Sequence, residues 1–225
     1  MTAWDSLPLT GPDAPAAFGR IVDSARNFAR SLPGEPPQQS RGIKSVIAIA
    51  TAEIRAGLGA DSSRLARDAS VIRLHKESVG GGRLKLQLFP LQAGESHPPH
   101  AHDDLLSCQI VLVGRVRMRE YSLLGRVDGD HIEVQTEPEK LLGKGEGTYT
   151  LQMKNNIHWQ EGLEPGTVLL NVNWQGYLPP SPMSAGRSQH GRCYLAWEKA
   201  RPGTQPDRLI VPELPLSAGV RSPAA

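Results

Sequence analysis

The sequence predicts a mainly β protein, a sandwich or barrel of short strands preceded by a helical segment. Two observations support this fold class. Apolar residues recur at helical spacing across residues 14–32, whereas from residue 70 short apolar runs alternate with turn signals. Many short strands without intervening helices are typical of a sandwich or barrel. We therefore divide the 225 residues into a helical segment packed on the barrel (1–69), the barrel itself (70–200) and a proline-rich tail (201–225).

Local signals place the elements within this division. One helix is expected over 14–32, and Pro33 ends it. A polar, proline-rich linker at 35–42 then leads to a second helix at about 43–58 and a helical turn at 62–67. The expected strands, which Gly- and Asp-rich turns separate, cover 70–75, 83–89, 107–113, 115–122, 131–135, 148–153, 167–175 and 192–197. In the tail, residues 209–211 are expected to pack against the barrel.

Composition narrows the range of partners. The formal net charge is +2, from 25 basic and 23 acidic side chains, so bulk electrostatics offers no case for binding nucleic acid. Two cysteines, Cys108 and Cys193, are too few for a disulfide scaffold, and no stretch approaches the ~20 apolar residues that span a bilayer. The first residues lack the pattern of a secretory signal. We expect a soluble cytoplasmic protein, monomeric or homodimeric, without a nucleic-acid or membrane partner.

Three of the seven histidines lie within six residues, in the stretch Gly94-Glu-Ser-His-Pro-Pro-His-Ala-His102. Histidine is the commonest metal ligand because its neutral imidazole offers a nitrogen lone pair near neutral pH. On an extended chain, side chains at i and i+2 point to the same face, so His100 and His102 are placed to bind one ion. A third ligand has to come from another part of the chain.

A second segment supplies a matching pattern. The first segment reads Gly94, five residues, His100, one residue, His102, four residues, Ser107, six residues, Gly114. The second reads Gly147, five residues, Met153, one residue, Asn155, two residues, His158, three residues, Gly162. These spacings resemble the two signature motifs of the cupin superfamily, in which a double-stranded β-helix (jelly-roll) barrel holds a metal. The resemblance implies a cupin-type barrel with His100, His102 and His158 as metal ligands.

Position 107 departs from the cupin pattern. Most cupins carry a glutamate ligand there, and this chain has Ser107. The remaining set of three neutral imidazoles resembles the thiol dioxygenases, a cupin branch typified by cysteine dioxygenase. The resemblance implies an Fe(II) cofactor, because a ferrous ion with three histidine ligands leaves positions for a substrate and dioxygen together. Zinc, nickel and copper are the alternatives, since ligand type alone does not choose among these metals.

The resemblance extends to residues outside the two motifs. Arg73 precedes the His-x-His by nearly the distance of the family's substrate-carboxylate arginine, and a guanidinium binds a carboxylate with two parallel hydrogen bonds. His75, two residues along the same predicted strand, is expected to face the same way and to line the substrate site, with a core histidine as the alternative. Tyr177 resembles the family's active-site tyrosine. Asn173 and Gln175 precede it where the family has serine and histidine.

The other candidates near the motifs have weaker signals. We expect His97, which lies among prolines, at the rim or in the outer shell of the site rather than on the metal. Asp103 and Asp104 offer the carboxylate that position 107 lacks, but a solvated loop edge is the preferred interpretation. Cys108 follows Ser107 and by alternation points away from it, so a packed thiol is expected.

The resemblance thus predicts a metal-dependent oxidoreductase, a non-haem Fe(II) dioxygenase that uses O2 to oxidise a small carboxylate-bearing thiol to its sulfinate. Arg73 would hold the carboxylate, and Tyr177 would hydrogen-bond oxygen or the substrate. Two alternatives stay open. One is a cupin enzyme that acts on a non-thiol small molecule as an oxygenase, lyase or isomerase. The other is a cupin that binds a small ligand without turnover.

Overall fold

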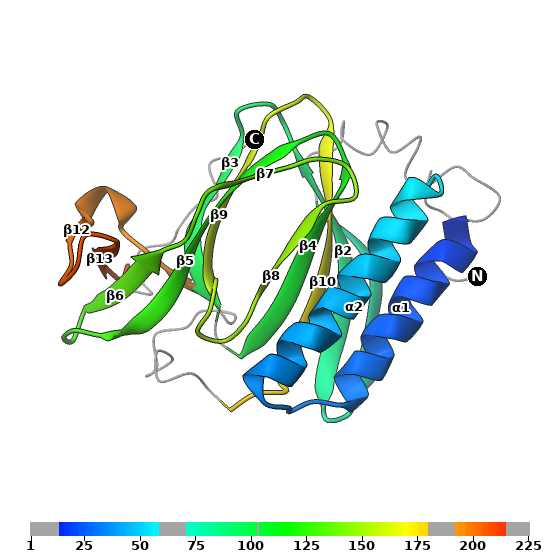
Figure 1. The fold of residues 1–225 in the computed structure, drawn as a ribbon, viewed down its shortest axis with the longest axis horizontal. Coiled ribbons are helices and arrows are strands. Elements are labelled where there is room, and N and C mark those ends of the chain that lie inside the picture. Colours follow the sequence, from blue (N-terminus) through cyan, green and yellow to red (C-terminus); the bar gives the residue numbers. More distant parts are fainter. Residues whose placement is uncertain (1–13, 59–70, 103, 180–191, 215–225) are drawn as a thin grey trace.

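The protein folds into two antiparallel β-sheets that face each other, with two helices on the outside of one sheet (Figure 1). This computed structural model describes residues 14–58, 71–102, 104–179 and 192–214. Sheet A consists, in spatial order, of β1 (Ile72–Val79), β2 (Gly82–Leu91), β10 (Thr167–Gln175), β4 (Leu105–Val113) and β8 (Gly147–Thr150). Sheet B consists of β11 (Arg192–Tyr194), β3 (Ser96–His102), β9 (Ile157–Gly162), β5 (Val116–Arg126), β6 (His131–Thr136), β13 (Arg208–Pro212) and β12 (Arg201–Pro202), with β7 (Lys140–Leu142) beside β5. The predicted fold class, a mainly β jelly-roll barrel with an N-terminal helical segment, is confirmed.

Strands β3 and β9, which carry the three motif histidines, were not among the predicted strands. In β3, residues 98 and 99 are prolines, which lack a backbone N–H and so weaken the strand signal. The structure accommodates them at an irregularity, because the register between β3 and β9 shifts between His97 and His100. Prolines are tolerated within a sheet at such bulges. The histidine stretch is therefore a strand rather than a loop.

Two helices cover the outer face of sheet A. Helix α1 (Ala14–Arg30) agrees with the predicted helix, and α2 (Pro36–Arg55) begins seven residues before the predicted start at 43. The expected linker at 35–42 is therefore wrong. Pro36 and Pro37 occupy the first helical positions, where the missing N–H is not needed, and the Glu35 N–H donates to Gln38 Oε1 at 3.2 Å. The expected turn at 62–67 lies outside the described residues.

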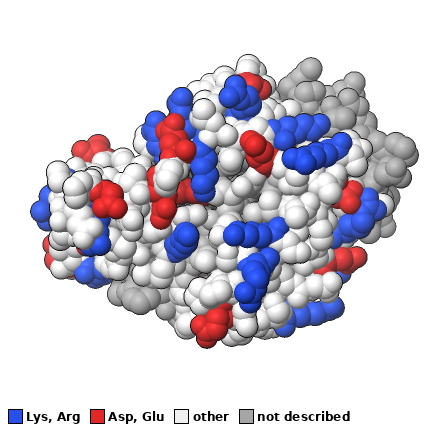
Figure 2. All heavy atoms as spheres, viewed as in Figure 1, with Lys and Arg blue, Asp and Glu red and all other residues white. Residues whose placement is uncertain are grey.

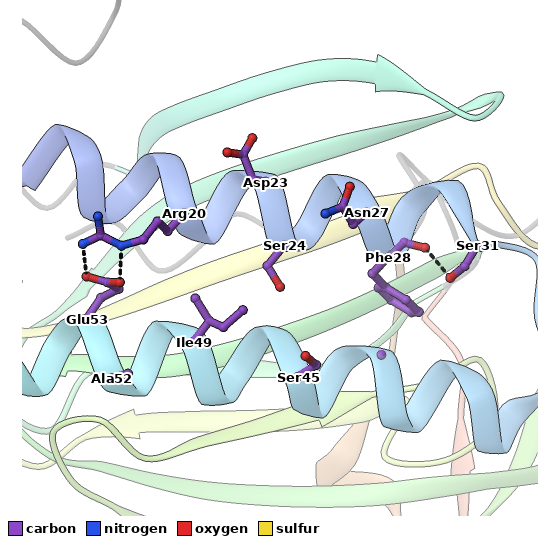
Figure 3. Close-up of a pocket in the computed structure, with 11 residues that line it drawn as sticks. Arg20, Asp23, Ser24, Asn27, Phe28, Ser31, Ser45, Ile49, Ala52 and Glu53 are labelled. Atoms are coloured by element: carbon purple, nitrogen blue, oxygen red, sulfur yellow. Dashed lines mark hydrogen bonds and ion pairs between the residues drawn. The ribbon is translucent and has the colours of Figure 1, made fainter.

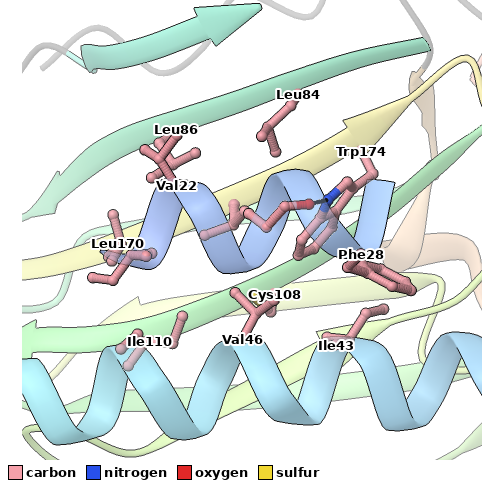
Figure 4. Close-up of a cluster of buried hydrophobic side chains, with 14 of the residues drawn as sticks. Val22, Phe28, Ile43, Val46, Leu84, Leu86, Cys108, Ile110, Leu170 and Trp174 are labelled. Atoms are coloured by element: carbon pink, nitrogen blue, oxygen red, sulfur yellow. Dashed lines mark hydrogen bonds between the residues drawn. The ribbon is translucent and has the colours of Figure 1, made fainter. Parts of the chain in front are cut away.

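The main hydrophobic core lies between these helices and sheet A (Figure 4). Trp174 is fully buried there, and its indole Nε1–H donates to the Ala25 carbonyl at 3.0 Å. The Phe28 ring meets the Trp174 ring edge to face, with centroids 5.0 Å apart. Cys108 is also fully buried in this core, as the alternation around Ser107 predicted, and burial raises the pKa of its thiol.

The surface between the helices is hollowed by a groove of about 680 Å³ (Figure 3). Arg20 of α1 and Glu53 of α2 bridge one end with two hydrogen bonds of 2.5 and 2.6 Å. On the face shown in Figure 2, basic and acidic side chains are interspersed over the described residues, in line with the small net charge. No helix in the described part of the chain is long and apolar enough to cross a membrane.

The barrel interior lies between the two sheets and is layered. One layer is apolar and contains Leu91, Val111, Val116, Met118, Leu142 and Leu169, with Phe89 packed against it. The next layer is polar. Its position is marked by a hydrogen bond across the barrel, in which Thr148 of sheet A donates to Glu120 of sheet B at 2.6 Å. The metal-motif histidines lie in this polar part.

The C-terminal tail contributes strands to sheet B. Residues 209–211, which were expected to pack against the barrel, belong to β13, and β13 pairs with β6. Buried Glu213 follows this strand and forms an ion pair with Arg126 of β5 at 2.8 Å. These contacts cover the outer side of sheet B, where Ile132, Val134 and Val211 share a second hydrophobic cluster.

Candidate metal centre

Backbone pairing brings the three motif histidines together. His100 of β3 is the register partner of His158 of β9, and His158 is in turn the partner of Glu120 of β5. Partners in adjacent strands present their side chains to the same face of a sheet. The neighbours Ala101 and Ile157 alternate to the other face and pack in the outer cluster. His100, His102 and His158 therefore point into the barrel.

The geometry of the three imidazoles fits one metal ion. They are 1%, 7% and 4% exposed, and one ligand nitrogen from each lies within 4.8 Å of the other two. The Nε2 atoms of His102 and His158 are 3.4 Å apart. Two nitrogens bound at about 2.1 Å to one ion are about 3.0 to 3.4 Å apart in octahedral or tetrahedral geometry. The donor set thus suits a divalent transition metal with small adjustments of the rings.

Asn156 holds the backbone of the second ligand in place. Its side-chain oxygen accepts the His102 N–H at 2.9 Å, and its amide nitrogen donates to the His102 carbonyl at 2.8 Å. The same nitrogen also contacts the carbonyl of Gln152 at 2.6 Å. Asn156 is 1% exposed, so these bonds are shielded from water. Sequence reasoning named its neighbour Asn155 as the motif residue and missed Asn156, because a clamp on a backbone has no signature in spacing.

Ser107 is fully buried and hydrogen-bonded. Its Oγ lies 2.6 Å from Thr150 Oγ1 and accepts the Gln109 amide N–H at 3.1 Å. The partners of Ser107 in these two hydrogen bonds, Thr150 and Gln109, are neutral, so this contact supplies no negative charge.

The nearest register neighbour of the histidines that carries charge is Glu120. Its carboxylate is 1% exposed, accepts the Thr148 hydroxyl and forms an ion pair with Lys140 Nζ. The pair carries no net charge, and a buried carboxylate needs such partners. Because Lys140 already balances the charge of Glu120, this carboxylate would not neutralise a metal ion bound at the histidines.

The structure separates Arg73 from His75. Arg73 pairs with Gln87 of β2, whereas His75 pairs with Leu86, because a bulge at residue 74 shifts the register between them. Gln87 and Leu86 lie on opposite faces of β2, and Leu86 belongs to the core beneath the helices. His75 Nε2 lies 3.5 Å from Glu77, which also binds Arg26 of α1. The expectation that His75 shares the face of Arg73 is wrong, since one extra residue in a strand reverses the alternation.

The active-site role predicted for Tyr177 has two candidate residues, Tyr177 and Tyr194. The Tyr177 ring belongs to the core of sheet A and the helices, and its hydroxyl donates to the Val79 carbonyl at 2.6 Å. Burial raises the pKa of this phenol. Tyr194 of β11 is the register partner of His100, and the two ring centroids are 5.8 Å apart. Sequence reasoning missed Tyr194, because the pairing of β11 with β3 is long-range.

The remaining candidates lie as follows. Arg73 is exposed on β1, an edge strand of sheet A. The Asp104 carboxylate accepts the Leu178 N–H at 3.2 Å and is not in the group of three histidines. His97 belongs to β3, but its side chain lies outside what the structure describes, as does the whole of residue 103.

Comparisons with known proteins find similarity only among solved structures. No protein-family profile and no curated protein matches the sequence. Structures similar to this chain include KdgF from Halomonas sp. (13% identity over 47% of this chain and 76% of that one, TM-score 0.34). A second is a recombinant oxalate oxidase in complex with glycolate, with 16% identity over 49% of this chain and 52% of that one and a TM-score of 0.34. A third is a cupin superfamily protein from Desulfitobacterium hafniense DCB-2, with 16% identity over 49% of this chain and 84% of that one and a TM-score of 0.32. Each likeness covers about half of this chain.

Proposed function

We propose that this protein is a mononuclear metal enzyme, a non-haem Fe(II) dioxygenase that converts a small thiol to its sulfinate. The observation that carries the proposal is the buried group of three imidazoles, which in the described residues includes no carboxylate. A bound ferrous ion would supply adjacent positions for a thiol sulfur and for O2. The reaction balances as one thiol and one O2 giving one sulfinic acid. The O–O bond breaks, both oxygens bond to sulfur, and sulfur loses four electrons.

The residues around the histidines have separate tasks in this proposal. His100, His102 and His158 hold the ion, and Asn156 orients His102 through its backbone. Tyr194, whose ring is tilted against that of His100, places a phenol where it would donate a hydrogen bond to the substrate or to oxygen. Arg73, in register with Gln87, would bind a substrate carboxylate from the edge of sheet A. We assign no task to His75 or Tyr177, given the contacts described above.

Metal content and oxygen consumption test the proposal together. The protein is loaded with Fe(II) without oxygen, its bound iron is measured, and O2 uptake is followed with cysteine, 3-mercaptopropionate and cysteamine. We expect one iron per chain and thiol-dependent uptake with a sulfinate product. If oxygen uptake requires a carboxylate on the thiol, and Arg73→Met removes this requirement, the assignment of Arg73 as the carboxylate-binding residue is supported. Iron binding without any thiol-dependent uptake would reject the reaction but keep the metal site.

Matched variants separate the site from general damage. His100→Ala should lose both iron and oxygen uptake. His131→Ala should keep both, because His131 is paired with Asp128 at 2.9 Å on the surface. Stoichiometric iron in His100→Ala would contradict the metal assignment. Tyr194→Phe should lower turnover at unchanged iron content, and the same loss in Tyr177→Phe but not in Tyr194→Phe would contradict the choice of tyrosine.

A further inference from the structure

A row of amide side chains faces the histidines across the barrel. Gln109 of β4 is the register partner of Thr148 on one side and of Asn171 on the other, and Asn171 is the partner of Gln87. Register partners share a face, and Thr148 reaches across the barrel to Glu120. The amides of Gln87, Asn171 and Gln109 therefore lie on the inner face of sheet A. Glu120 is in the register row of His158 and His100, so the amide row stands opposite these ligands.

Oxygen atoms in this interior are left without hydrogen-bond partners. Among the described residues, Gln109 Oε1 and Asn171 Oδ1 are buried and accept no hydrogen bond. Gln109 is 2% exposed, and its amide nitrogen is already used by Ser107, so the oxygen is the free half of the group. A buried acceptor without a donor costs about 1 to 3 kcal/mol. Such an atom gains a hydrogen bond when a molecule with a donor group binds beside it.

A third acceptor lies on the opposite sheet. Gln160 of β9 is two residues from His158, so it shares the inward face, and its partner Met118 belongs to the apolar layer inside the barrel. Gln160 is 2% exposed, and its Oε1 has no partner within the described part of the chain. Buried acceptors thus lie on the inner faces of both sheets. The apolar layer beneath them, with Met118 and Val111, offers no donor.

We infer that the molecule bound beside the metal carries hydroxyl groups, which donate hydrogen bonds to Gln109, Asn171 and Gln160. This inference rests on the proposed function, since it names the substrate class of the same site. A hydroxyl supplies the donor that each amide oxygen lacks. A carboxylate supplies only acceptors and would leave these oxygens unpaired. The amide row is therefore a specificity-determining surface that favours a small hydroxylated thiol over an alkyl thiol of similar size.

Calorimetric titration of the Co(II)-loaded protein without oxygen tests the inference, because it measures binding without turnover. The probes are 1-thioglycerol, 1-propanethiol and 3-mercaptopropionate, which share a thiol and differ in the remainder. We expect 1-thioglycerol to bind about tenfold more tightly than 1-propanethiol, the effect of about one net hydrogen bond. Equal affinities of 1-thioglycerol and 1-propanethiol would overturn the inference while leaving the metal site in place. The affinity of 3-mercaptopropionate measures the separate contribution of a carboxylate contact to Arg73.

Variants of the amides locate the preference. Gln109→Met and Asn171→Leu keep side-chain size, and each should reduce the advantage of 1-thioglycerol to about twofold or less. Gln135→Met is the matched control, since Gln135 binds Asp207 on the exposed side of β6, and it should keep the full preference. Co(II) content and circular dichroism confirm that each variant is folded. A full preference in both amide variants overturns the inference. Failure of the unaltered protein to bind Co(II) rejects the metal centre and this inference with it.

Discussion

At Gly42 in α2, adding one methyl group should have two opposing effects on the free energy of unfolding: a gain in helix propensity and a loss in tertiary packing. A Cβ built on Gly42 would lie 2.2 Å from Phe28 Cδ2 and 2.5 Å from Phe28 Cε2. The Phe28 ring is 7% exposed, and its centroid lies 5.0 Å from that of Trp174, so a displaced ring would disturb this aromatic pair. The glycine therefore permits the close contact of α2 with the aromatic pair.

The magnitude follows from two opposing effects. Replacing glycine by alanine in a helix interior stabilises the helix by about 1 kcal/mol. Overpacking a well-filled contact costs about 1 to 3 kcal/mol, and a rigid ring 2.2 Å away puts Gly42→Ala at the upper end. We expect a net loss of about 2 kcal/mol in the free energy of unfolding. For a chain of 225 residues this lowers Tm by roughly 4 to 8 °C.

Gly19 in α1 is the matched control. A Cβ there would meet nothing within 4 Å, so only the helix effect remains and Gly19→Ala should raise stability by up to about 1 kcal/mol. Urea unfolding followed by circular dichroism measures both changes. The two variants should thus shift in opposite directions. If Gly42→Ala is stabilised like Gly19→Ala, overpacking against Phe28 does not occur. The same conclusion follows if Gly42→Ala lowers stability as much in a Phe28→Ala background as in the unaltered protein.

Three further predictions concern the site, a surface ion pair and the buried thiol. Asn156→Ala should weaken metal binding about 10- to 100-fold, because the His102 backbone loses its two hydrogen bonds to this side chain. Competition with a chelator measures the metal affinity, and an unchanged circular dichroism spectrum shows that the variant is folded. Unaltered affinity would count against this role of Asn156. The Arg20 guanidinium lowers the pKa of Glu53, so the pair stabilises the fold above the ordinary carboxyl pKa, and this contribution disappears as the pH falls through the lowered pKa. Glu53→Gln should therefore cost less than about 1 kcal/mol at pH 7 and nothing in strong acid, and a pH-independent difference would exclude this cause. Because burial raises the pKa of Cys108, iodoacetamide at pH 8 should label this thiol only after unfolding. Mass spectrometry measures the labelling. A labelled Cys108 in the native protein would show that the core opens.

Local sequence patterns predicted the parts of the fold that depend on local chemistry. Helix α1 has an apolar stripe at helical spacing, and most strands of sheet A have period-two alternation, so both were predictable. The start of α2 was missed because prolines at 36 and 37 were interpreted as linker residues, although proline suits the first helical turn. Strand β9 was missed because it is short and mixed in composition.

The candidate site divides in the same way. Alternation along an extended chain paired His100 with His102, and the resemblance of two segments to the cupin motifs added His158. Spacing failed for His75, where one extra residue at position 74 turned the side chain to the helix side. It also failed for Tyr194 and Asn156, whose relation to the histidines comes from pairing between distant segments.

The sequence by itself determined which donor groups the candidate metal centre offers. Three imidazoles and a serine in place of a carboxylate are properties of residue identity, and no folding is needed to state them. Only the tertiary structure decided what surrounds those ligands. The amide row of sheet A and the phenol of Tyr194 face the histidines because strands remote in sequence pair at a given register and the two sheets close on each other. Register depends on contacts summed over a whole sheet, and a local pattern does not contain that sum.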